Sequence, residues 1–209
     1  MRKKNNELIS AIKNDIFNNT KTYIIVIGIF VLGILFGVIF INQADNKEEI
    51  ANYINTYIDE TKVIENGDFI GELKNEITKN IQLVLLIWFS GTTIIGIPIV
   101  LGIILFRGFC FGYTISACVF VLGKIKGLFF ILMSMFMQNL IFIPALMILG
   151  VSSIKLYKSI IKDKRKENIK ISIIKHTIVS ILILITLIIT SIIKIEISYR
   201  MVLSLIKYF

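Results

Sequence analysis

The sequence predicts an all-α, polytopic integral membrane protein with five transmembrane helices and short amphipathic surface helices. Of its 209 residues, 56% are hydrophobic, and the mean hydropathy is +0.81. The apolar residues form long uncharged runs, and about 20 such residues cross a bilayer whose hydrocarbon core is roughly 30 Å thick. Acidic and basic residues are concentrated in different connecting segments, which is typical of a chain that is oriented in a membrane.

The chain begins with a basic segment, residues 1–21, in which apolar residues recur at helical spacing. We expect this segment to lie as an amphipathic helix along the cytoplasmic surface of the membrane. The first predicted span, residues 22–41, follows it. This run is too long for a signal peptide, and no small-residue cleavage pattern comes after it, so we expect the span to be retained.

An acidic segment, residues 42–80, follows the first span and carries nine acidic against four basic side chains. A capping-box pattern at Asp45 and Glu48, followed by apolar residues at helical spacing, predicts short amphipathic helices outside the membrane. Their apolar faces must be buried against another surface. One candidate cover is the membrane surface or the protein's own spans, and the other is a protein partner outside the membrane.

Four further spans are predicted at residues 81–106, 108–123, 127–154 and 176–193. Pro98 lies inside the first of these, where a proline removes a backbone hydrogen bond and bends the helix. The span 108–123 is shorter than the usual crossing length. A re-entrant hairpin is therefore an alternative there, and it would reverse the orientation of everything that follows.

The charge of the connecting segments predicts the orientation. Residues 155–175 carry eight basic and two acidic side chains, a balance of +6, and basic loops stay in the cytoplasm. A re-entrant hairpin would place this loop outside, so the charge favours five complete crossings. The N-terminus is then cytoplasmic and the C-terminus extracytoplasmic, with residues 194–209 as an amphipathic tail on the outer surface. The basic loop can also contact anionic lipid headgroups.

The sequence lacks the residue patterns of enzymes and metal sites. The single histidine, His176, begins the last span, and neither HExxH nor GxxxxGK[ST] occurs. The long apolar runs contain no Asp or Glu, which removes the acidic member of a Ser-His-Asp site and the carboxylates of ion-coupled transporters. Residues 88–91 superficially resemble a serine nucleophile turn, but its leading glycine is missing. We therefore predict no enzyme activity and no cofactor or metal.

A nucleic-acid partner is not expected either. Proteins that bind single-stranded nucleic acid combine basic residues with aromatic side chains on which the bases stack. The basic loop contains a single aromatic residue, Tyr157. Its charge is better explained by membrane orientation.

Three polar side chains fall at or near membrane depth, namely Arg107, Gln138 and Asn139. The amide pair suits hydrogen bonds between helices. Arg107 is expected to end an inward-running span at the cytoplasmic face, where its guanidinium can reach lipid phosphates. Gly108, Gly112 and Ser116 follow at four-residue intervals and leave a flat stripe on which another helix, for example the fourth span, can pack.

Several motifs in the middle of the chain carry a family resemblance. In order they are Trp88-Phe89-x-Gly91, Ile95-Gly96-x-Pro98-Ile99, Arg107-Gly108-x-x-x-Gly112-Tyr113-Thr114, and Gln138-Asn139-Leu140 with Pro144. Their order and spacing, with the five-span layout, resemble the stage II sporulation protein M family over nearly the whole chain. One departure is Met137, where the family usually has a proline before Gln-Asn.

The resemblance implies a function that composition does not show. Members of this family act when the mother cell engulfs the forespore, as the polytopic component of a complex with two single-span peptidoglycan hydrolases, stage II sporulation proteins D and P. The resemblance therefore implies a scaffold that recruits and localises these hydrolases to the sporulation septum and the engulfing membrane without cutting the wall itself. The expected partners are membrane lipids and the two hydrolases, and a homo-oligomer is compatible with this role.

Partner contacts are expected on the acidic outer segment and on the first span, where Gly28, Gly33 and Gly37 allow close helix approach. A small transporter or channel is an alternative from a different class. Its motivation is that bends at Pro98 and Pro144, beside the polar residues at membrane depth, can line a path. A membrane hydrolase is a third alternative, for which the catalytic residues are missing.

Overall fold

A computed structural model of the chain describes residues 16–43, 48–52, 54–56, 69–93, 96–162, 166–193 and 195. Within these ranges nearly every residue is helical, which confirms the predicted all-α class. The long helices are α2 (Thr20–Gln43), α4 (Phe69–Thr92), α5 (Gly96–Leu122), α6 (Lys124–Lys162) and α7 (Lys166–Ile193). Most of the predicted N-terminal helix 1–21, the capping residue Asp45 and the tail 194–209 except Ile195 lie outside the described residues.

Four of these helices have the length and composition of membrane spans: α2, α5, residues 139–161 of α6, and residues 169–193 of α7. The first half of α4 carries Glu72, Lys74, Glu76 and Lys79, so the apolar part of this helix is too short to qualify. The predicted count of five crossings is therefore not confirmed.

Large apolar side chains cover the outer faces of α2 and α7. Examples are Ile24, Leu35 and Phe36 on α2, and Ile181, Ile185 and Ile189 on α7, all of them exposed. Soluble monomers rarely expose contiguous apolar surfaces of this kind, whereas a lipid bilayer solvates them. The arrangement is that of a multi-pass membrane protein.

The break between the predicted spans 81–106 and 108–123 lies at residues 93–95 and not at Arg107. α5 continues without interruption from Gly96 to Leu122, so the predicted boundaries of these two spans are wrong. The chain turns where the backbone amides of Thr93 and Gly96 donate to the carbonyls of Ser90 and Thr93, at 3.1 and 3.2 Å. With 27 residues, α5 is long enough for a complete crossing.

Pro98 does not bend a span, contrary to the prediction. It is the third residue of α5, and the first four amide groups of a helix have no intrahelical acceptor. A proline there removes no hydrogen bond, and its fixed φ suits the start of a helix. Pro144, in contrast, lies inside α6 and interrupts the hydrogen-bond ladder of that 39-residue helix.

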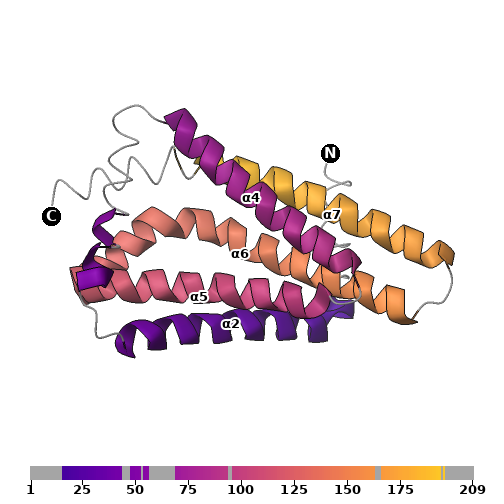
Figure 1. Ribbon diagram of the computed structural model, residues 1–209, viewed down its shortest axis with the longest axis horizontal. Coiled ribbons are helices and arrows are strands. Elements are labelled where there is room, and N and C mark those ends of the chain that lie inside the picture. The colour runs from indigo at the N-terminus through magenta and orange to yellow at the C-terminus, as the bar shows by residue number, and fades with distance from the viewer. Residues whose placement is uncertain are drawn as a thin grey trace.

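Successive long helices run in opposite directions (Figure 1). The start of α2, the 93–95 turn and the α6–α7 connection therefore lie at one end of the bundle, and the α2–α4 connection and the α5–α6 turn lie at the other. The first end carries the basic side chains Lys21, Lys155, Lys158, Lys170 and Lys175. The second end carries both signs, namely Glu48, Glu49, Glu72 and Glu76 beside Lys74, Lys79, Lys124 and Lys126, and it holds all the acidic side chains that the structure describes. We call these the basic end and the acidic end.

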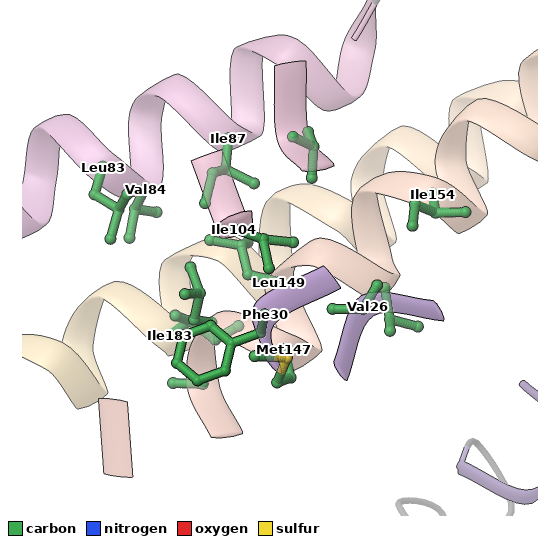
Figure 2. Packing of buried hydrophobic residues seen from close by; sticks show 14 of the residues in the cluster. Val26, Phe30, Leu83, Val84, Ile87, Ile104, Met147, Leu149, Ile154 and Ile183 are labelled. Carbon is green, nitrogen blue, oxygen red and sulfur yellow. The ribbon is translucent and has the colours of Figure 1, made fainter. Parts of the chain in front are cut away.

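The core lies between all five helices. One buried cluster receives side chains from every long helix: Val26 and Phe30 of α2, Leu83 and Ile87 of α4, Ile104 of α5, Leu149 of α6, and Ile183 and Leu187 of α7. Figure 2 shows side chains of this cluster converging from different helices. α4 packs across α5, α6 and α7 and so completes the cover of the core.

α2 and α5 approach so closely that their backbones touch. A Cβ atom on Gly33 or Gly37 would overlap the carbonyl oxygen of Leu105 or Phe109, respectively. On the facing helix, a Cβ on Gly108 or Gly112 would overlap the carbonyl oxygen of Phe30 or Ile34. The predicted glycine stripe of α5 therefore packs against the first span, α2. It does not pack against the fourth predicted span.

The described residues between α2 and α4 are covered in part by the protein itself. Residues 48–52 and 54–56 are helical, and Ile50 and Ile54 are buried in a second cluster with Ile41 and Ala117 at the acidic end. The apolar face of this short helix thus packs against α2 and α5. Its opposite face exposes Glu48, Glu49, Asn52, Asn55 and Thr56.

Gly112→Ala is expected to lower the free energy of unfolding in lipid bicelles by about 1–3 kcal/mol, because the added methyl overlaps backbone that cannot move aside. Gly102→Ala is the matched control in the same helix, since nothing lies within 4 Å of its Cβ position. The control should be neutral or slightly stabilising. Equal effects of the two substitutions would contradict the close contact.

Cysteine labelling tests the position of the turn between α4 and α5, in a protein with Cys110→Ser and Cys118→Ala. Thr93→Cys and Lys170→Cys should react with an impermeant reagent from one side of the membrane, and Glu49→Cys and Lys124→Cys from the opposite side. Phe106→Cys, at an exposed position near the middle of α5, is the unreactive control. Protection of Thr93→Cys would place the turn inside the bilayer.

Candidate functional site

The residues singled out by the sequence fall in two places. The α4–α5 turn near the basic end is surrounded by Trp88, Gly91, Gly96 and Pro98. Farther from the basic end lie Arg107 on α5 and Asn139 and Pro144 on α6. Gly108 and Gly112 face α2. The side chain of Gln138 lies outside the described part of the chain. The structure thus joins the sequence motifs into two sites rather than one.

The tight α4–α5 turn explains Gly96. A Cβ atom at this position would overlap the carbonyl oxygen of Ser90. The Thr93 hydroxyl donates to the same carbonyl at 2.9 Å. Any larger residue at position 96 would open the turn and move the start of α5 away from the end of α4.

Trp88 and Gly91 form the contact of α4 with α6 and α7. The Trp88 indole N–H donates to Thr177 Oγ1 of α7 at 3.0 Å. Gly91 faces His176 and Ser153, and a Cβ on Gly91 would lie 2.9 Å from both His176 Nε2 and Ser153 Oγ. Trp88 therefore fixes α4 on α7, and the missing side chain of Gly91 leaves room for the imidazole.

His176 is the buried centre of this site, and sequence reasoning gave it no role. Its side chain is 1% exposed, Nδ1 lies 2.9 Å from Ser152 Oγ, and Nε2 is buried with no hydrogen-bond partner among the described residues. A Ser–His pair is the core of many nucleophilic sites, but there a third, usually acidic group orients the imidazole. Residues 77–162 and 168–195 contain no Asp or Glu. The chemistry that this arrangement supports is hydrogen bonding between helices.

Arg107 lies at mid-depth and not at the cytoplasmic face, which corrects the position expected for it. The next residue, Gly108, touches the backbone of Phe30 and Gly33, near the middle of α2. Arg107 is therefore about 16 Å along α5 from Gly96, at a rise of 1.5 Å per residue. That distance is too long for the side chain to bring its charge out to the headgroups without distorting the bilayer.

The Arg107 guanidinium is held by an aromatic ring. Its Cζ lies 5.6 Å from the centroid of the Phe142 ring on α6, within the range of a cation–π contact. Phe142 lies between Asn139 and Pro144 in sequence, so this contact brings the arginine motif of α5 next to the second polar motif. An intramembrane charge of this kind is costly and marks a functional position by default.

The family model described as stage II sporulation protein M matches residues 26–196. No curated protein and no solved structure matches the chain.

A double-mutant cycle with Arg107→Met and Phe142→Leu should give a coupling energy of about 0.5–2 kcal/mol in the free energy of unfolding in bicelles. The physical reason is that each single change removes the same cation–π contact. Phe129→Leu, at an exposed ring on the same helix, is the control partner for Arg107→Met and should show no coupling. Additive effects for both pairs would mean that the contact carries no energy.

Proposed function

Because the chain belongs to the stage II sporulation protein M family, we propose that this sporulation-related membrane protein is a scaffold for peptidoglycan hydrolases. It recruits stage II sporulation proteins D and P and localises them at the septum, where the mother cell engulfs the forespore. It performs no wall cleavage itself. The sites described above contain polar contacts between helices and no arrangement that would activate a nucleophile.

The proposed orientation rests on the charges at the two ends of the bundle. Lysines gathered at the basic end favour a cytoplasmic location for that end. The acidic end then faces the space in which hydrolases reach the wall. In this orientation the N-terminus is cytoplasmic and the C-terminus is extracytoplasmic.

The surface that supports recruitment is the short helical segment of residues 48–52 and 54–56. Ile50 and Ile54 are 3% and 0% exposed and hold this helix on the ends of α2 and α5, so its polar face has a fixed position above the bilayer. Glu48 and Glu49 are exposed on that face. Charged groups at the rim of an interface steer association and select partners. A basic surface on a hydrolase is the complement that this helix would select.

Charge reversal tests this surface. Glu48→Lys with Glu49→Lys should reduce co-purification of the two hydrolases with the membrane-embedded scaffold by at least about tenfold, because like charges then face each other. Lys124→Glu with Lys126→Glu, two reversals at the same end of the bundle, is the matched control and should retain binding. Unchanged recovery of the hydrolases by the Glu48/Glu49 variant would reject this helix as the docking surface.

A transporter or channel remains the second candidate, and the mid-depth position of Arg107 favours it. Intramembrane charges commonly mark ion and substrate paths, and the Phe142 ring lies beside this one. The geometry supports this candidate less than the sequence did, because Pro98 lies in the first turn of α5 and provides no bend. Ion flux through liposomes that is abolished by Arg107→Met would favour it over the scaffold.

A further inference from the structure

A groove opens between α6 and α7 at the basic end. Its volume is about 530 Å³, and one part of its wall is polar, formed by Ser152, Lys155, Ser172 and Lys175. Another part is apolar and includes Ile178 and Val179. The groove therefore offers positive charge and hydroxyl groups beside a hydrophobic surface.

Two hydrogen bonds join the helices that form the groove. The hydroxyls of Ser159 and Ser172 lie 2.8 Å apart toward the α6–α7 connection, and Ser152 bonds to the buried His176 deeper in the bundle. These contacts set the spacing of α6 and α7 on both sides of the groove. The groove is thus part of the folded structure and does not require a ligand to open it.

The groove lies where the helices leave the hydrocarbon. Lys158 Nζ, one turn beyond Lys155, donates to Thr22 Oγ1 at 3.0 Å. Thr22 follows Lys21, the last charged residue before the uncharged run of α2. The lysines of the groove are therefore at the level of the lipid headgroups, and its apolar residues lie beside the acyl chains.

We propose that this groove binds one anionic phospholipid. The ammonium groups of Lys155 and Lys175 contact the lipid phosphate, and an acyl chain lies along Ile178 and Val179. Three features carry the proposal: the preformed hollow, its two cations within a segment of net charge +6, and its depth in the membrane. Basic pockets between membrane helices bind anionic headgroups for the same reasons. The proposal is independent of hydrolase recruitment.

Native mass spectrometry of the full chain, released from micelles, tests the proposal. The wild-type protein should retain one phosphatidylglycerol in preference to phosphatidylcholine, which has a phosphate but no net charge. Lys155→Gln with Lys175→Gln should weaken phosphatidylglycerol binding about 30-fold, since each lysine near a membrane surface contributes roughly fivefold. Lys124→Gln with Lys126→Gln, which removes two lysines from the other end of α6, is the matched control and should bind like wild type.

Two outcomes would overturn the proposal. One is equal lipid binding by the groove variant and the control variant, which would mean that attraction to lipid is not localised. The other is displacement of the lipid by millimolar inorganic phosphate, which would make the groove a site for soluble phosphate. The single substitution Lys175→Gln, at an exposed position, keeps the test valid if the double variant does not fold. It should weaken binding about fivefold.

Discussion

The close contact between α2 and α5 is the constraint on which the rest of the bundle depends. Gly33 and Gly37 on one helix and Gly108 and Gly112 on the other bring the two backbones together. Packing of this kind is one of the main sources of helix association in lipid, where no water is available to drive apolar surfaces together. Because the contact involves carbonyl groups on both sides, it also fixes the register of the helices. A shift by one residue would place a side chain where only a glycine fits.

The depth of Arg107 follows from this register. Gly108 cannot leave the backbone of α2 without losing the contact, so its neighbour is held near mid-bilayer. A guanidinium at that depth has no carboxylate available from the apolar parts of the chain, and the ring of Phe142 provides its described partner. The same glycines that stabilise the bundle therefore maintain a charge in an unfavourable environment. Such a charge is costly to the fold, and by default it marks a functional position.

Much of the fold could be predicted from hydropathy, glycine spacing and loop charge, but the turn at 93–95 could not. Residues 81–106 contain no charge, and hydropathy alone cannot locate a turn inside such a run. The sequence does contain a local signal for this turn, namely Gly91, the pair Thr92-Thr93 and Gly96. A proline two residues after Gly96 is typical of the start of a helix. The contacts of Trp88 and His176 were beyond prediction because the bonded partners are far apart in sequence and meet only after α4, α6 and α7 pack. Their positions depend on tertiary geometry that no local pattern encodes.

The length of α6 has a mechanical consequence. Its 39 residues extend about 58 Å, roughly twice the thickness of the hydrocarbon. Even at a tilt of about 40°, the upper end of the usual range, some 45 Å of the helix would remain along the bilayer normal. At that tilt about 26 residues of the helix fill the roughly 30 Å of hydrocarbon, so about 13 residues must stand outside it. Helix α6 thus projects beyond the hydrocarbon, and a molecule that approaches the membrane along its axis would meet the projecting end before it meets the lipid.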